Sequence, residues 1–194
     1  MNFLAHIYLS GSEEQVIIGN FIADGIKGKS YQNHPPGIQK GVLLHRFIDS
    51  FTDSHPTVRQ STARLHANYR HYSGVIVDIL YDHYLAKNWA AYHPQPLADY
   101  VQDFYELLHQ HYESLPVRTK RLMPYMIADN WLLSYATVDG IGKILSQMNH
   151  RTKGRSRMDQ AVTELQEYYE AFEQEFTEFF QELIAESKTK LASL

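Results

Sequence analysis

The sequence predicts an all-α protein that forms one helical bundle over residues 1–194. Apolar residues recur three and four positions apart through most of the chain, which is the period of an α-helix. No segment alternates apolar and polar residues between glycine-rich turns, as β-strands would. At 194 residues the chain is long enough to bury one sizeable core, so we expect a single domain.

Eight helices are expected, and the first four follow from apolar runs and prolines. The helix over 13–27 is apolar, and those over 37–52 and 56–70 begin just after Pro36 and at Pro56. A residue without a backbone N–H does no harm at a helix start. The helix over 74–91 is again mostly apolar. We therefore expect the apolar helices among these to pack in the core.

The second half of the chain continues the same period. Further helices are expected over 96–113, 121–135, 138–148 and 158–188. The last has an apolar stripe opposite a glutamate-rich face, so we expect it to lie on the outside and clamp the bundle. The stripe consists of Val162, Leu165, Tyr169, Phe172, Phe176, Phe179, Phe180 and Leu183.

Composition excludes several kinds of site. The chain has no cysteine, which excludes disulfides, thiolate zinc sites, iron–sulfur clusters and a cysteine nucleophile. Any metal must take nitrogen and oxygen ligands from the 11 histidines and 22 acidic residues. The nucleophile motif Gly-x-Ser-x-Gly and the glycine-rich phosphate and dinucleotide loops are absent.

No targeting or membrane segment is expected. The apolar segment 1–9 has no basic flank and is interrupted by His6, unlike a signal peptide. No stretch approaches the roughly 18 apolar residues of a membrane span. We expect a cytoplasmic protein that does not bind membranes.

Charge is segregated along the chain although the net charge is only −4. Residues 118–158 carry 8 basic and 2 acidic side chains, whereas residues 159–194 carry 2 basic and 9 acidic ones. This pattern predicts docking of an acidic or phosphate-bearing partner, or else two solvated connections. The acidic balance of the whole chain counts against nucleic acid. The candidate docking residues are Arg118, Lys120, Arg121, Arg151, Lys153, Arg155 and Arg157.

Two pairs of ionisable residues lie four positions apart on apolar helices. They are His45/Asp49 and Asp78/Asp82, with His83 directly after the second pair. Residues at this spacing share one helical stripe, and burying them costs several kcal/mol unless they are paired or hold a metal. If these side chains converge with Asp24 in the bundle, they form a nitrogen and oxygen site for one or two divalent cations.

The residue types leave the metal and the alternatives open. Imidazole and carboxylate ligands favour manganese, iron, cobalt or zinc over calcium and are compatible with magnesium. The alternative is a structural network of Asp–His and Asp–Arg ion pairs, which Arg46 would join. His6 alone is typical of a hydrogen-bonded core histidine. Asp53 is typical of a helix-capping turn.

Five motifs follow one another along the chain. They are Met-Asn-Phe-Leu-Ala-His at 1–6, Gly-Asn-x-x-Ala-Asp at 19–24, Gly-x-x-x-His-Arg-x-Ile-Asp at 41–49, Thr-Asp-x-x-Pro at 52–56 and Asp-x-x-x-Asp-His-x-Leu at 78–85. In this order they resemble the acyl carrier protein phosphodiesterases, also called holo-acyl-carrier-protein hydrolases. The resemblance implies an all-helical fold like that of the HD-domain phosphohydrolases. The adjacent His-Asp doublet of that superfamily is missing, because Arg46 follows His45 and the other doublet is reversed.

The resemblance also implies an activity. The family removes the 4′-phosphopantetheine group from holo-acyl carrier protein, which leaves apo-acyl carrier protein, and needs a divalent metal such as Mn²⁺, with Mg²⁺, Co²⁺ or Fe²⁺ as other candidates. By position in the motifs, the implied metal ligands are His6, Asp24, His45, Asp78 and His83. Asp49 and Asp82 then become candidates for a base or for groups that orient the ligand histidines.

A mechanism follows as a hypothesis. The metal would lower the pKa of a bound water, Asp49 or Asp82 would accept a proton from it, and the phosphodiester would be attacked in line. Arg46 and Arg59 would neutralise charge on the phosphoryl oxygens. The basic segment would dock the acidic carrier protein. Two alternatives stay open: an HD-like phosphohydrolase of nucleotides or small phosphodiesters, and a non-catalytic helical binding module.

Overall fold

The computed structural model describes residues 1–194 and contains helices but no strand, which confirms the all-α prediction. Six short 3₁₀ turns link eleven α-helices, which surround one apolar core of 48 buried residues. The α-helices are α1 (Phe3–Leu9), α2 (Glu14–Ile22), α3 (Pro36–Ser54), α4 (Pro56–Tyr69), α5 (Ser73–Lys87), α6 (Leu97–Gln110), α7 (Val117–Ala128), α8 (Trp131–Ser134), α9 (Val138–Arg151), α10 (Val162–Glu167) and α11 (Tyr169–Ala192).

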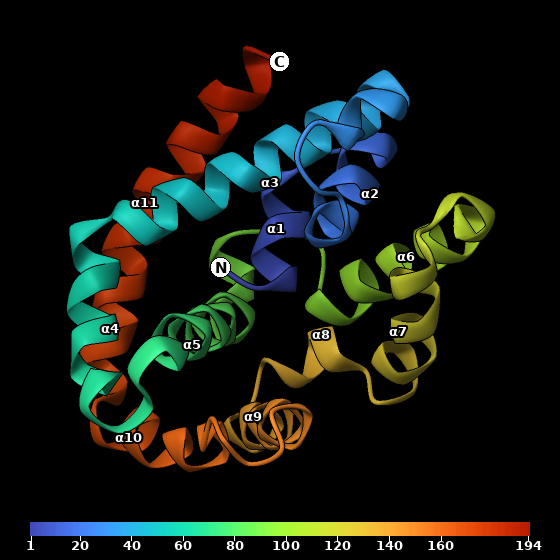
Figure 1. The fold of residues 1–194 in the computed structure, drawn as a ribbon. Coiled ribbons are helices and arrows are strands. Elements are labelled where there is room, and N and C mark those ends of the chain that lie inside the picture. Colours follow the sequence, from blue (N-terminus) through green and yellow to red (C-terminus); the bar gives the residue numbers. More distant parts are fainter.

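The long C-terminal helix lies where the sequence predicts it. α11 runs along one side of the molecule and contacts α3, α4 and α5 (Figure 1). Phe172, Phe176 and Phe180 on its apolar stripe are fully buried, so they anchor the helix to the core. On the far side of α5, the shorter helices α6 to α9 complete the bundle (Figure 1).

The predicted helices over 13–27 and 74–91 end early, at Ile22 and Lys87, and three larger differences follow. The predicted helix over 121–135 is divided into α7 and α8, because Asn130 adopts a left-handed conformation with φ +45°. The predicted helix over 158–188 is divided into a 3₁₀ turn, α10 and α11 at Tyr168, whose φ of −111° and ψ of 26° are not helical. α1 was not predicted at all: it has only seven residues, and although Asn2 caps Phe3 locally, other N-terminal N–H groups are accepted by Asp82 of α5, a partner that local sequence does not reveal.

A close crossing of α2 and α3 positions the functional residues. A Cβ atom at Gly19 would lie 2.4 Å from the carbonyl oxygen of Ile38, and one at Gly41 would lie 2.3 Å from that of Val16. Both positions therefore require glycine, because any side chain would force the two backbones apart. The crossing brings Asn20 of α2 next to His45 of α3.

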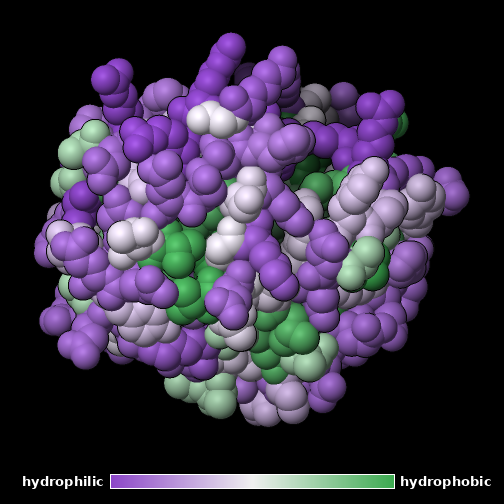
Figure 2. All heavy atoms as spheres, turned by 90° about the horizontal axis from the view of Figure 1, so that it is seen from below, coloured by the Kyte–Doolittle hydropathy of each residue, from purple (hydrophilic) through white to green (hydrophobic).

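The surface is mainly hydrophilic. Seen from below, hydrophilic residues cover most of the face, with smaller hydrophobic areas between them (Figure 2). None of the helices combines the length and the apolar character needed to cross a membrane.

Candidate active site

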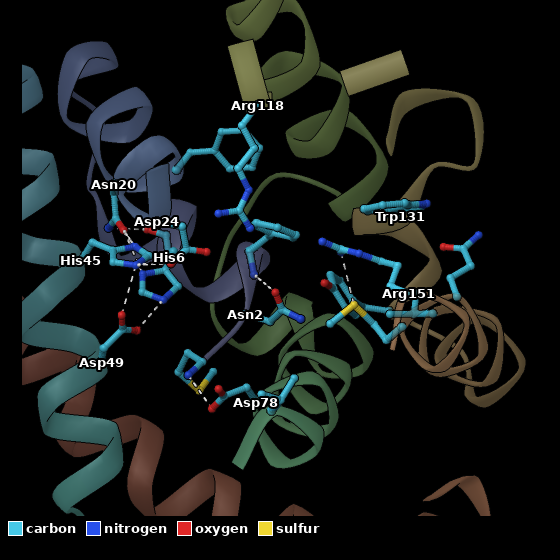
Figure 3. A pocket seen from close by; sticks show the side chains of 18 of the residues that line it. Asn2, His6, Asn20, Asp24, His45, Asp49, Asp78, Arg118, Trp131 and Arg151 are labelled. Atoms are coloured by element: carbon cyan, nitrogen blue, oxygen red, sulfur yellow. Dashed lines mark hydrogen bonds and ion pairs between the residues drawn. The ribbon is translucent and has the colours of Figure 1, made fainter. Parts of the chain in front are cut away.

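A pocket of about 400 Å³ opens between the N-terminal helices and α7 to α9 (Figure 3). This volume lies within the range of roughly 300–1,000 Å³ typical of small-molecule sites. One side of the pocket carries histidines and carboxylates, and the other is lined by aromatic and aliphatic side chains and two arginines. The lining residues are Met1, Asn2, Phe3, His6, Asn20, Phe21, Asp24, His45, Asp49, Asp53, Val75, Asp78, Arg118, Trp131, Tyr135, Ile144, Gln147, Met148 and Arg151.

His6, Asp24, His45 and Asp49 form the polar side, which we call the His–Asp cluster. The Asp49 carboxylate lies between the two imidazoles, with Oδ1 3.2 Å from Nε2 of His6 and Oδ2 3.1 Å from Nε2 of His45. Oδ1 of Asp24 lies 3.4 Å from the same Nε2 of His45. The two imidazole rings stack with their centroids 4.1 Å apart. One atom each from His6, His45 and Asp49 lie within 4.8 Å of one another, close enough to share one ion.

Asn20 holds both imidazoles and sets their protonation. Its buried side-chain oxygen lies 2.8 Å from Nδ1 of His6 and 3.0 Å from Nδ1 of His45. Its amide nitrogen donates to the carbonyl oxygen of His6 and to Oγ of Ser10, which fixes the orientation of the amide. Because an amide oxygen only accepts, both Nδ1 atoms carry the hydrogen. Both Nε2 atoms therefore point toward the carboxylates, where they could bind a metal.

Burial and the neighbouring carboxylates shift the pKa values in opposite directions. Burial lowers the pKa of His6, so its imidazole is neutral at pH 7. For His45, burial is outweighed by the hydrogen bonds of Asp24 and Asp49, which raise its pKa to about 9. Burial of Asp49 is likewise outweighed by His45 and His6, which hold the pKa of its carboxyl well below its usual range. Without a metal, the His–Asp cluster therefore contains one imidazolium and two carboxylates.

The cluster is assembled from three elements. His6 comes from α1, and His45 and Asp49 lie one turn apart on α3. Asp24 follows α2 in a 3₁₀ turn, where its side chain is 62% exposed. The exposure leaves the Asp24 carboxylate open to water on the pocket side of the cluster.

Asp78 and Asp82 lie on α5 and contact the start of the chain instead. Asp78 lines the pocket and pairs with the amino group of Met1 at 2.7 Å. Asp82 is fully buried and accepts the backbone N–H groups of Asn2 and Leu4, at 3.1 and 2.7 Å, which caps α1. Burial raises the pKa of Asp82 to about 7, against the opposing effect of the N-terminal amino group and these N–H groups.

His83 lies apart from the cluster and does not line the pocket. Its Nδ1 donates to the carbonyl oxygen of Tyr135 at 2.7 Å, and its Nε2 accepts from the hydroxyl of Tyr169 at 2.8 Å. Both ring nitrogens are thus occupied by protein groups, so the structure does not bring His83 to a metal together with His6 and His45.

The two arginines predicted to bind phosphate also lie outside the pocket. Nη2 of Arg46 donates to the carbonyl oxygen of Ile26 at 3.0 Å, and its guanidinium lies over the ring of Tyr31. Arg46 therefore holds the turn that carries Asp24. Arg59 is exposed on α4.

Of the seven candidate docking residues, two line the pocket and five lie outside it. Arg118 and Arg151 line the pocket. Lys120 is half-buried beside Tyr112 and donates to the carbonyl oxygen of Glu113. The remaining four residues are exposed outside the pocket: Arg121, Lys153, Arg155 and Arg157.

Sequence reasoning missed Asn20 as a functional residue. The signal was present, because Asn20 is a polar residue inside an apolar helix and lies four positions before Asp24. It also missed that Arg118 and Arg151 enter the pocket, for which no sequence signal exists, since 32 residues separate them.

Comparisons with known proteins identify the family. The family model for acyl carrier protein phosphodiesterase matches residues 1–183. Proteins named acyl carrier protein phosphodiesterase from Yersinia pestis, Pectobacterium atrosepticum and Escherichia coli are each 29% identical over 98% of this chain and 99% of their own length. No solved structure matches, so the relation to HD-domain proteins stays a prediction. The chain belongs to the acyl carrier protein phosphodiesterase family.

Proposed function

We propose that this protein is a metal-dependent hydrolase that removes 4′-phosphopantetheine from holo-acyl carrier protein to give apo-acyl carrier protein. Membership of the family supports a hydrolase that acts on phosphodiester bonds. The proposal of metal dependence is supported mainly by the His–Asp cluster. In it, Asn20 orients His6 and His45 so that both Nε2 atoms face Asp49.

The charges of the cluster fit a divalent cation. With His6 neutral, its Nε2 lone pair faces a carboxylate oxygen 3.2 Å away, an arrangement that is repulsive unless a cation lies between them. Two carboxylates and one imidazolium leave a net charge of −1. A divalent cation that displaces the His45 proton would bring this charge to zero. Mixed nitrogen and oxygen ligands favour Mn²⁺, Fe²⁺, Co²⁺ or Zn²⁺.

His6, His45 and Asp49 would hold the cation, and its chemistry would be to lower the pKa of a bound water. Asn20 fixes the imidazoles, and the exposed Asp24 is placed to accept the proton that the water loses. Water adds to phosphorus and the bond to the carrier's serine oxygen breaks. That oxygen takes up a proton, so the products are 4′-phosphopantetheine and a free serine.

Intact-mass spectrometry tests this function. Holo-acyl carrier protein incubated with the protein and Mn²⁺ is expected to lose the mass of its phosphopantetheine group. A chelator and the Asp49→Asn variant should each abolish the loss, whereas Asp103→Asn, an exposed control on α6, should not. Hydrolysis of a small chromogenic diester without any carrier cleavage would point to a small-phosphodiester hydrolase. Absence of stoichiometric metal from active protein would contradict the metal site.

A further inference from the structure

Two guanidinium groups from distant parts of the chain point into the pocket opposite the His–Asp cluster. Arg118 lies in the first turn of α7 and Arg151 at the last residue of α9. Figure 3 shows the Arg118 side chain entering close to Asp24 and His6 and the Arg151 side chain extending from the opposite side toward the middle of the pocket. Convergence of two arginines on one cavity is typical of anion recognition.

Neither arginine has a structural partner that explains its position. No carboxylate pairs with either guanidinium, whereas Arg64 elsewhere in the fold pairs with Glu175 at 2.7 Å. The one polar side-chain contact of Arg151 is the thioether of Met148, a weak acceptor. Arg118 also lies at the positive end of the α7 dipole, where a cation is unfavourable. Apart from this weak contact, both groups therefore keep their donors free.

The surroundings leave both groups accessible to an anion. Arg118 and Arg151 are exposed residues, and Phe3, Phe21, Ile144 and Met148 line the same pocket. The carboxylates of Asp24, Asp49, Asp53 and Asp78 line the same pocket. A phosphodiester that approached the cluster would be repelled by these acids unless cationic side chains compensated its charge.

We propose that Arg118 and Arg151 form the phosphate-binding subsite, which holds the non-bridging oxygens of the scissile phosphodiester against the His–Asp cluster. This inference rests on the proposed function and gives these two residues a role different from docking the carrier. The phosphate lies between the arginines and the cluster, where the guanidinium groups neutralise charge that grows on its oxygens during attack.

The test compares two substrates and two pairs of variants. The substrates are holo-acyl carrier protein and bis(p-nitrophenyl) phosphate, which has no carrier. Arg118→Gln and Arg151→Gln are each expected to lower kcat/KM about 10- to 100-fold on both substrates, since each removes a charge-assisted contact to the phosphate. The controls Arg121→Gln and Arg155→Gln, which are exposed outside the pocket, should leave hydrolysis of the small diester unchanged. Metal content should be unchanged in all four variants.

Two results would overturn the subsite. A loss confined to the carrier substrate would make Arg118 and Arg151 docking residues, and unchanged kinetics on both substrates would remove them from the site. Calorimetric titration with inorganic phosphate separates this inference from the proposed function. Should the wild-type protein cleave neither substrate, the proposed function fails. The subsite would still stand if metal-loaded wild-type protein binds phosphate and the two pocket variants do not, and would fall if all bind alike.

Discussion

Helices α3 and α5 carry the same pattern, two ionisable residues four positions apart, but they use it differently. In α3, His45 and Asp49 pair with each other, and Asp49 also contacts the imidazole of His6 on α1. In α5, Asp78 and Asp82 bind the amino group of Met1 and the backbone N–H groups of α1. The spacing thus predicts a shared face, whereas the partner on that face decides between a reactive cluster and a helix cap.

The two pairs act on the same short helix. Asp82 caps the N-terminus of α1, and His6 lies one turn further along that helix. The α5 pair therefore orients the helix that supplies an imidazole to the α3 pair. This division of roles predicts that variants of the two pairs will separate activity from stability.

The largest effect is expected for Asp49→Asn. The amide keeps the shape of the side chain but removes the charge between the two Nε2 atoms. We expect kcat/KM to fall by about 1,000-fold or more and Mn²⁺ affinity to fall about 100-fold. The melting temperature of metal-free protein should also fall, because the pairing with His45 and His6 that holds the Asp49 pKa low is lost, but solvent screening of the half-buried carboxylate limits this loss. Calorimetric titration with Mn²⁺ and steady-state kinetics measure these changes. If Asp49→Asn binds Mn²⁺ as tightly as the wild-type protein, the α3 pair does not hold the metal and the contrast with the α5 pair is wrong.

A smaller effect of a different kind is expected for Asp82→Ala. The change leaves buried N–H groups of α1 without their acceptor, at a cost of about 3 kcal/mol in the free energy of unfolding. Urea denaturation measures the loss, with Asp103→Ala as a control expected to stay within about 0.5 kcal/mol. Mn²⁺ should still bind to the folded fraction. A stable variant that has lost its metal would instead place Asp82 in the reactive cluster.

The smallest effect, measured per pH unit, is a pH dependence that separates the two pairs in metal-free protein. Folding raises the pKa of Asp82 to about 7 and that of His45 to about 9, so in both cases the folded state binds the proton more tightly than the unfolded state. The contributions of Asp82 and His45 to stability are therefore expected to fall as pH rises, each by at most about 1.4 kcal/mol per pH unit. The lowered pKa of His6 acts in the opposite direction below about pH 6.5.

The windows differ because the unfolded pKa values differ. The Asp82 contribution is lost between about pH 4 and 7, and the His45 contribution between about pH 6.5 and 9. Denaturation curves across this range should flatten in the lower window for Asp82→Asn and in the upper window for His45→Gln. If the plot of unfolding free energy against pH is the same for both variants as for the wild-type protein, the assigned pKa directions are wrong.

The elements could be predicted from the sequence where helical periodicity and local end signals act together. The helix that begins at Pro56 and the buried phenylalanine stripe of α11 are examples, since both depend on residues within a few turns of one another. α1 could not be predicted in this way, because it is only seven residues long and, beyond the local cap by Asn2, depends on a carboxylate 78 residues away. Left-handed Asn130, which divides the helix expected over 121–135, is a different case, because asparagine adopts this conformation more readily than other non-glycine residues and the local signal was therefore present.

For the site, the sequence by itself determined the chemistry: no cysteine, and histidines and carboxylates spaced on apolar helices. Only the tertiary structure decided which of them meet. It placed His6 with His45 and Asp49, turned His83 toward Tyr135 and Tyr169, and brought Arg118 and Arg151 into the same pocket. The physical reason is that helical periodicity assigns a side chain to a face. The backbone approach at Gly19 and Gly41 then decides what lies opposite it.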